Sequence, residues 1–232
     1  MPLFKRTLSE FLFRRFMLKH YASNILVDMN LEAKRQTLAY ITENMVDVPF
    51  YEKHPQLVDY VLDQVATDGL YLEFGVGRGK TMRWIGSRVS GPVHGFDSFE
   101  GIPEYWNGNP IGAFAQKKLP KVPDNVDFHI GLFDATLPSF LSAHPGPVAF
   151  LHVDCDLYSS TCTIFDGLGG RLQPGAIVLF DEYFNFHRWQ QHEFKGFQEF
   201  VARSSIEYEY IAFSVTGQQV AVRILSNPSY SA

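Results

Sequence analysis

The chain has 232 residues, of which 46% are hydrophobic and 19% are charged, with a formal net charge of −5. This composition is typical of one globular domain with a buried core, and the acidic balance argues against a nucleic-acid partner, because no overall basic field exists to displace counterions. No apolar run approaches membrane-spanning length and no signal-peptide pattern is present, so we expect no transmembrane segment and a cytoplasmic location.

The first twenty residues differ from the rest in charge. They hold five basic residues against one acidic residue, a net charge of +4, between phenylalanines and leucines. A basic amphipathic helix can lie on an anionic membrane or bind a partner. The alternative, which we favour, is a terminal helix that packs on the same or a second subunit. We therefore expect residues 1–54 to form an N-terminal helical arm or lid that can support a homo-oligomer.

The next elements alternate in type along the chain. Hydrophobic periodicity predicts helices at 31–45 and 55–66, with an aromatic-rich connector at 46–51 between them. Strands separated by helices follow. The strands are predicted at 70–75, 93–97, 126–130, 148–154 and 176–181, and the helices near 79–89, 135–143, 158–171 and 190–204. Such alternation implies parallel pairing with right-handed crossovers.

The end of the chain breaks this alternation. Residues 208–215 and 219–225 read as two strands joined by a short turn, which is the pattern of an antiparallel hairpin. We therefore expect an α/β domain at 55–232 with a doubly wound, mostly parallel, seven-stranded sheet and a C-terminal antiparallel hairpin. The irregular segment 101–125 holds four prolines and is long enough to be a lid or binding loop.

The most informative motif is a glycine-rich turn after the first of these strands. Glu73 precedes glycines at 75, 77 and 79, and the predicted helix begins near Thr81. Glycines let the backbone turn sharply and approach a ligand. The next strand ends in Asp97, followed by Ser98, and an acid at this place can accept hydrogen bonds from both ribose hydroxyls. The motif therefore predicts a nucleoside-cofactor site.

The spacing separates three classes of cofactor. A dinucleotide fold needs a third glycine at position 80, which is Lys80, and a phosphate-binding P-loop needs its first glycine at position 74, which is Phe74. The spacing that remains, E-x-G-x-G-x-G, resembles the first motif of class I S-adenosylmethionine-dependent methyltransferases. An acid before the first glycine suits a ligand with sulfonium and ammonium groups better than a pyrophosphate. A structural strand-to-helix corner is the alternative that we disfavour.

Acidic residues lie at or just after the ends of all five predicted parallel strands. Phe133 and Asp134 come after the third strand, where they could flank an adenine ring and its amino group. Asp154 ends the fourth strand, Asp181 ends the fifth, and Glu182 follows it. These three carboxylates could share a hard cation such as Mg²⁺, and a bound metal could lower the pKa of a substrate hydroxyl. Without a metal they would repel one another, and one would tend to hold a proton.

Three longer segments narrow the resemblance. Residues 96–103, 131–138 and 154–161 are similar to the macrocin O-methyltransferase family, and the similarity runs from about residue 55 to the C-terminus. The family has a Rossmann-like methyltransferase fold, methylates sugar hydroxyls of macrolide antibiotics and uses Mg²⁺. The resemblance implies roles for residues at two places. Cofactor contacts are implied for Glu73, Gly75, Asp97, Ser98 and Asp134, and metal positions for Asp154, Asp181 and Glu182.

The segment after the fifth strand, residues 184–194, differs from the pattern of that family. It is rich in aromatic residues and holds His187 and His192, which could take the proton of an acceptor hydroxyl, because imidazole titrates near neutral pH. The alternative is that both histidines cap or cover the following helix. His152 lies in a predicted core strand, and we expect it to be structural.

Together these patterns predict an S-adenosylmethionine-dependent O-methyltransferase. The expected acceptor is a small hydroxylated metabolite, with a sugar or a glycosylated natural product as candidates. Asp154 and Asp181 are expected to activate its hydroxyl, with or without Mg²⁺. Two alternatives stay open at this point: a metal-independent methyltransferase with another acceptor, and a cofactor-binding scaffold without turnover.

Overall fold

A single eight-stranded sheet organises residues 8–230, the part of the chain that the computed structural model describes. The strand order is β1-β7-β8-β6-β5-β2-β3-β4, and only β8 runs antiparallel to its neighbours. The strands are β1 (Phe50–Tyr51), β2 (Leu70–Phe74), β3 (Val93–Asp97), β4 (Val126–Ile130), β5 (Val148–Val153), β6 (Leu172–Phe180), β7 (Glu207–Ser214) and β8 (Val220–Ser226).

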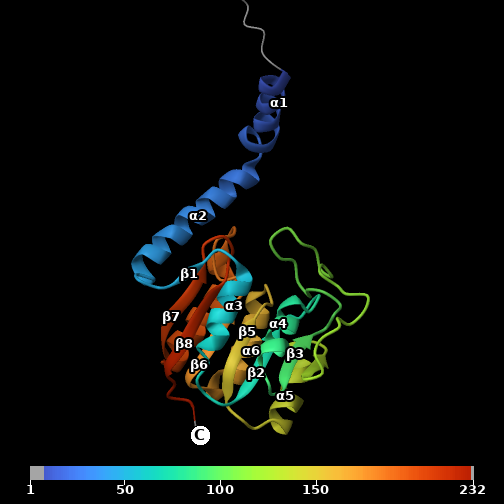
Figure 1. Cartoon of the computed structure of the whole chain (residues 1–232), viewed down its shortest axis with the longest axis vertical. Helices are drawn as coiled ribbons and strands as arrows, with labels where there is room; N and C mark the ends of the chain where they lie inside the picture. The colour runs from blue at the N-terminus through green and yellow to red at the C-terminus, as the bar shows by residue number, and fades with distance from the viewer. Residues whose placement is uncertain (1–7, 231–232) are drawn as a thin grey trace, which may run out of the picture.

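Helices cover both faces of the sheet (Figure 1). The helices are α1 (Leu8–Met17), α2 (Ile25–Asn44), α3 (His54–Asp63), α4 (Lys80–Arg88), α5 (Phe133–Ala143), α6 (Tyr158–Leu168) and α7 (Glu193–Ser204). Strand β6 shows how the two layers form, because its side chains alternate between faces. Ile177 and Leu179 pack with α3 and α4, whereas Val178 and Phe180 pack with α6 and α7.

The structure confirms the mostly parallel sheet with a C-terminal antiparallel hairpin, and it adds an eighth strand to the seven predicted. The additional strand is β1, which lies in the segment predicted as a connector. The amide of Phe213 donates to the carbonyl of Pro49 at 3.1 Å, and the amide of Val215 donates to that of Tyr51 at 3.1 Å. A two-residue strand is too short for its side chains to form an alternating pattern, so the sequence carries no signal for it.

The strand order indicates the edge of the sheet at which a ligand is expected to bind. Strand β3 lies on one side of β2, while β5, which comes later in the chain, lies on the other. The strand order therefore reverses at β2, and ligands of open α/β sheets bind beyond the carboxyl ends of the strands at such a point. The glycine-rich turn follows β2 directly.

The N-terminal helices extend away from the sheet (Figure 1). Helix α2 is attached by its second half, where Thr37 Oγ1 accepts a hydrogen bond from the amide of Asn185 at 2.9 Å. Helix α1 exposes apolar side chains, with Phe13 65% and Phe16 52% accessible to solvent. The start of the predicted basic segment, residues 1–7, lies outside the described residues. No described helix combines the length and the hydropathy that a membrane crossing requires.

Candidate active site

A cleft with a volume of about 1150 Å³ opens at the carboxyl ends of the strands. Its walls come from the glycine-rich turn, from the ends of β3, β5 and β6, and from the irregular segment after β3. Ten of the predicted site residues line it, namely Gly75, Gly77, Thr81, Asp97, Ser98, Phe133, Asp134, Asp154, Asp181 and Glu182. The residues at the predicted strand ends therefore share one continuous cleft.

The glycines of the turn serve three different purposes. Gly75 has a φ of +94°, and a side chain there would lie 1.6 Å from the carbonyl oxygen of Asp154, so β2 and β5 can approach only with glycine at this position. Gly79 has a φ of +65° and caps α4. Gly77 is open, because an added Cβ would meet no atom within 4 Å. The cleft thus has free space directly above the turn.

Asp97 holds this turn in place. Its Oδ2 accepts hydrogen bonds from the amides of Val76 at 2.9 Å and Gly77 at 2.7 Å, and its Oδ1 accepts one from Phe99 at 2.6 Å. A carboxylate offers about four acceptor positions, so capacity remains for a ligand hydroxyl. The predicted ribose acceptor is therefore also the residue that ties the end of β3 to the glycine-rich turn.

The wall beyond Asp97 combines aromatic and polar groups. Phe133 begins α5, and its ring packs edge-on against Phe74 with centroids 5.0 Å apart. Asp134 follows it on the same wall. Ser98 Oγ accepts a hydrogen bond from the amide of Glu100 at 3.1 Å and so fixes the start of the irregular segment. An apolar ring next to a carboxylate is the environment expected for an adenine base.

Three carboxylates, Asp154, Asp181 and Glu182, form what we call the acid cluster. One ligand oxygen from each lies within 4.8 Å of the other two. Burial, followed by the charge of Asp181, raises the pKa of Asp154 and of Glu182 well above the usual range. In the described part of the chain, Glu182 Oε2 is buried and has no hydrogen-bond partner.

These oxygens fit a hard divalent cation. Oxygen donors are the ligands that Mg²⁺ takes, and a cation would relieve the repulsion among three nearby carboxylates. The unpartnered Oε2 of Glu182 is free to supply such a ligand. Asp181 and Glu182 come from the end of β6 and Asp154 from the end of the neighbouring β5, so the parallel pairing of two strands creates the arrangement.

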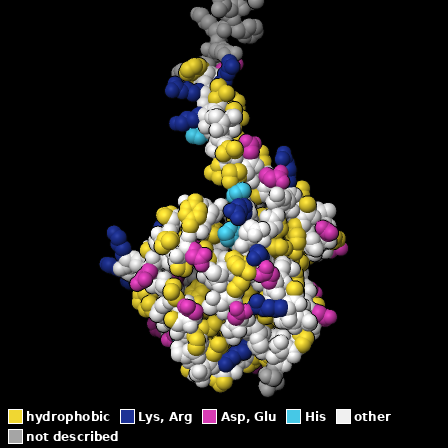
Figure 2. Space-filling view, turned by 180° about the vertical axis from the view of Figure 1, so that it is seen from behind, with side chains coloured by type: hydrophobic (Ala, Val, Ile, Leu, Met, Phe, Trp, Pro, Cys, Tyr) yellow, Lys and Arg dark blue, Asp and Glu magenta, His cyan; other side chains and the backbone are white. Residues whose placement is uncertain are grey.

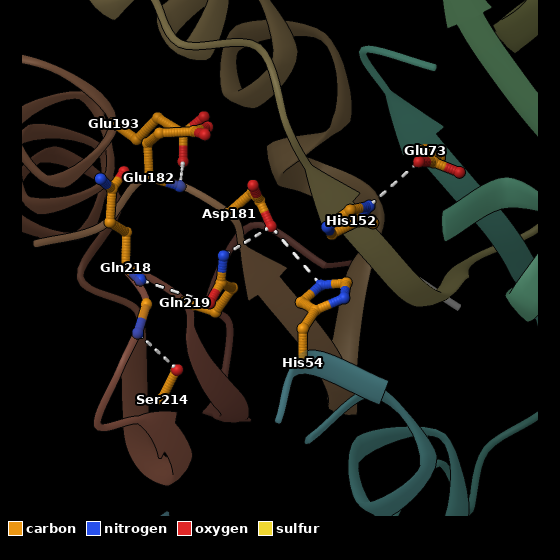
Figure 3. Close-up of polar contacts among 10 residues, drawn as sticks. His54, Glu73, His152, Asp181, Glu182, Glu193, Ser214, Gln218 and Gln219 are labelled. Carbon is orange, nitrogen blue, oxygen red and sulfur yellow. Dashed lines mark hydrogen bonds and ion pairs between the residues drawn. The ribbon is translucent and has the colours of Figure 1, made fainter. Parts of the chain in front are cut away.

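Two residues outside the predicted set contact Asp181 (Figure 3). Gln219 Nε2 donates a hydrogen bond to Asp181 Oδ1 at 3.0 Å, and His54 Nε2 lies 3.5 Å from the same oxygen. Burial lowers the pKa of His54, opposed by the charge of Asp181. His54 begins α3 and lines the cleft. Both residues are far from Asp181 in the sequence, and no motif marks either one.

Glu73 lies beneath the cleft rather than on its wall. It is 1% exposed, and its Oε1 lies 3.3 Å from His152 Nδ1 (Figure 3). Burial raises the pKa of Glu73, opposed by the nearby imidazole of His152. His152, which the sequence suggested to be structural, lies within 4.8 Å of Glu73 and Asp154 by its ligand atoms. Glu73 is therefore not among the residues that line the cleft, and its contact with the cofactor stays a prediction.

The two histidines predicted as bases, His187 and His192, do not line the cleft. Among the described residues that line the cleft, neither His187 nor His192 is present, and Gly79 is also absent. The ring of His192 packs 6.2 Å from Trp106 and 5.7 Å from Phe186, between centroids. It therefore packs against the irregular segment, and among the histidines of the described residues only His54 lines the cleft.

A carboxylate missed by the sequence analysis connects the two loops of the acid cluster. Glu193, the first residue of α7, is fully buried, and it accepts hydrogen bonds from the amides of Cys155, Asp156 and Glu182. Burial, followed by the charge of Asp156, raises its pKa to about 8, opposed by the backbone hydrogen bonds. Burial followed by the charge of Asp181 raises the pKa of Asp156 to about 7.

Comparison with known proteins agrees with this geometry. Residues 72–183, which contain the glycine-rich turn and the acid cluster, match a family model described as a methyltransferase domain. Over 171 residues, the chain is 29% identical to an 8-demethyl-8-(2,3-dimethoxy-alpha-L-rhamnosyl)-tetracenomycin-C 4'-O-methyltransferase of Streptomyces olivaceus. The alignment covers 60% of this chain and 64% of that relative, so it spans less than two thirds of the relative's length.

Solved structures share the fold. The calicheamicin methyltransferase CalS11 has a TM-score of 0.56 at 19% identity, covering 94% of this chain and 93% of its own. The O-methyltransferase NovP has a TM-score of 0.56 at 23% identity, covering 74% and 78%. TomG from Streptomyces achromogenes, an O-methyltransferase solved with its methyl donor, has a TM-score of 0.51 at 18% identity, covering 84% and 90%. Residues 72–183 thus match a methyltransferase domain, and the chain shares the fold of these solved methyltransferases.

Proposed function

We propose that the chain transfers a methyl group from S-adenosylmethionine to a hydroxyl of a sugar or of a glycosylated natural product. The observation that carries this proposal is the presence, in one cleft, of the glycine-rich turn with Asp97 and of the acid cluster. The names of two similar proteins support the acceptor class, since one is a 4'-O-methyltransferase of a rhamnosyl-tetracenomycin and the other is a calicheamicin methyltransferase.

Each wall of the cleft has its own role in the proposal. Asp97 accepts hydrogen bonds from the ribose hydroxyls, and Ser98 and Thr81 lie next to the ribose. Phe133 and Asp134 contact the adenine. Gly75, Gly77 and Gly79 shape the turn that the donor approaches, while Glu73 supplies negative charge from below. S-adenosylmethionine carries a methyl group on a positively charged sulfur. As the acceptor oxygen forms the new C–O bond, the C–S bond breaks and the sulfur leaves in the neutral thioether S-adenosylhomocysteine.

The acid cluster activates the acceptor. Asp154 or Asp181 accepts the hydroxyl proton, so that the oxygen gains the electron pair with which it attacks. Mg²⁺ held by Asp154, Asp181 and Glu182 would add Lewis-acid stabilisation of the oxygen. Gln219 and His54 orient Asp181 through its Oδ1. His187 and His192 stay alternative bases, although the cleft wall favours the carboxylates.

A screen of acceptors tests the proposal. Purified protein is mixed with labelled S-adenosylmethionine and glycosylated natural products, free sugars, amines or carboxylic acids, with Mg²⁺ or with EDTA. We expect label on a sugar hydroxyl, and less of it with EDTA. Label only on amines or carboxyl groups, insensitive to EDTA, would favour a metal-independent enzyme with another acceptor. Binding of the donor without transfer to any acceptor would favour a scaffold.

We also propose that a second copy of the chain covers the N-terminal arm. The arm exposes Phe13 and Phe16, and residues 1–20 carry a net charge of +4, which leaves −9 on residues 21–232. These opposite charges favour contact between one copy's arm and another copy's body. Light scattering should report a dimer that Phe13→Asp reduces to a monomer. A monomeric protein that binds anionic vesicles would contradict this.

The cytoplasmic location and the domain boundary between 54 and 55 stay predictions.

A further inference from the structure

We propose that Glu193 is a positioning residue that fixes the two loops of the acid cluster relative to each other. Its role in the reaction rests on the proposed function, whereas its role in the loops does not. Glu193 does not line the cleft in the described part of the chain, so it acts through the residues that do.

The hydrogen bonds of Glu193 reach both loops at once. Its Oε1 accepts from the amides of Cys155 at 3.1 Å and Asp156 at 3.2 Å, which directly follow Asp154. Its Oε2 accepts from the amide of Glu182 at 3.1 Å, which directly follows Asp181 (Figure 3). One carboxylate therefore connects the end of β5 to the end of β6, at the level of the acid cluster.

A carboxylate has an acceptor oxygen for each loop, and the glutamate side chain is long enough to reach both loops. A glutamine has one acceptor oxygen and a donor NH₂ group, which would meet a backbone N–H at one of the two loops. The position at the first turn of α7 adds the favourable field of a helix N-terminus.

The surroundings of Glu193 agree with a positioning role. Glu193 is 0% exposed, and both of its side-chain oxygens accept hydrogen bonds from backbone amides of the two loops. In addition, Asp156 has a φ of +64°, a left-handed conformation that is rare for residues other than glycine. The amide of Asp156 itself and that of the preceding Cys155 both donate to Glu193 Oε1.

The test compares Glu193→Gln with Glu199→Gln as a matched control. Glu199 is on the same helix but exposed, where it accepts a hydrogen bond from the hydroxyl of Tyr158 at 2.6 Å. Four quantities are measured on the full chain: thermal unfolding, amide hydrogen exchange in segments 154–157 and 181–184, affinity for Mn²⁺ alone by electron paramagnetic resonance, and affinity for S-adenosylhomocysteine by calorimetry.

We expect Glu193→Gln to raise exchange in one or both segments by at least about tenfold. We also expect it to weaken Mn²⁺ by about 10- to 100-fold, the usual effect of removing a group that orients metal ligands. Affinity for S-adenosylhomocysteine should stay within about twofold, because the glycine-rich turn and Asp97 are untouched, and Glu199→Gln should change none of these quantities. A folded Glu193→Gln protein with native exchange and native Mn²⁺ affinity would overturn the inference.

Two further variants keep the outcomes separate. If Glu193→Gln does not fold, Glu193→Asp keeps the charge but is too short to reach both loops, and native exchange in both segments would again overturn the inference. Asp154→Asn tests the metal site itself. If it leaves Mn²⁺ affinity unchanged, the metal part of the proposed function fails, while the exchange data still decide the role of Glu193.

Discussion

Two groups of polar side chains meet directly after β6, where Glu182 of one group is followed by Tyr183 of the other, and they differ in how well they are hydrogen-bonded. In the tyrosine cluster, made of Tyr40, Tyr183, Tyr208, Tyr210 and Gln198, the hydroxyl of Tyr210 lies 2.5 Å from that of Tyr40, 2.7 Å from that of Tyr183 and 3.2 Å from that of Tyr208. Gln198 Nε2 donates to the hydroxyls of Tyr183 at 3.0 Å and Tyr208 at 2.9 Å.

The acid cluster is built in the opposite way. Its three carboxylates crowd together at the cleft, and Glu182 Oε2 is without a hydrogen-bond partner in the described residues. Below it, the side-chain oxygens of Glu73 and the ring nitrogens of His152 are also buried without a hydrogen-bond partner. A fully hydrogen-bonded network stabilises a fold, whereas an unsatisfied buried group lowers stability and marks a place for a ligand. The comparison assigns stability to one cluster and chemistry to the other.

The largest expected effect comes from Asp154→Asn. It removes a proton acceptor and metal ligand, so transfer to the acceptor found in the screen should fall by about 10²- to 10⁴-fold. Stability to chemical denaturation should stay equal or rise, because one of three repelling buried carboxylates is gone. Asp124→Asn, at an exposed site, is the control. A variant that loses stability and keeps its transfer rate would reverse the assignment.

The reciprocal variant is Tyr210→Phe. It leaves the hydroxyls of Tyr40 and Tyr183 without their shared partner, which should lower the free energy of unfolding by about 1–3 kcal/mol. Transfer per folded molecule should be unchanged. Tyr21→Phe, on the exposed arm, should alter neither quantity. The comparison breaks if Tyr210→Phe slows transfer without any loss of stability in urea.

The smallest effect is expected for Glu73→Gln. The substitution keeps the shape of the side chain and removes a buried charge whose oxygens have no hydrogen-bond partner, so the free energy of unfolding should change by less than about 1 kcal/mol. Affinity for S-adenosylmethionine should fall a few-fold more than affinity for its neutral product, because only the donor carries a sulfonium. Destabilisation of about 3 kcal/mol or more would instead identify the Glu73–His152 pair as a structural ion pair.

The sequence predicted what depends on neighbouring residues. Alternation of strands and helices, the turn at Gly75 and the acids that follow each strand are all local patterns, and parallel pairing then brings the strand ends together without further information. For this reason, Asp97, Asp154 and Asp181 could be assigned to one cleft, and the structure brings them there.

The remaining site residues depend on contacts between distant segments. Cys155 and Glu193 are 38 residues apart, Gln219 and Asp181 are also 38 apart, and Tyr40 and Tyr210 are separated by 170. Hydrophobic periodicity reports which face of an element is buried, but not which distant polar group that face meets. His187 and His192 illustrate the same limit, since closeness in sequence to Glu182 did not bring either of them to the cleft wall.

The central claim is that the glycine-rich turn and Asp97 bind the methyl donor, and calorimetric titration with S-adenosylhomocysteine tests it most directly. The wild-type chain should bind with measurable heat, and Asp97→Ala, which frees the amides of Val76 and Gly77 and removes the ribose acceptor, should bind at least about tenfold more weakly. Absence of binding by the wild-type chain, or equal affinity of a folded Asp97→Ala variant, would contradict the account.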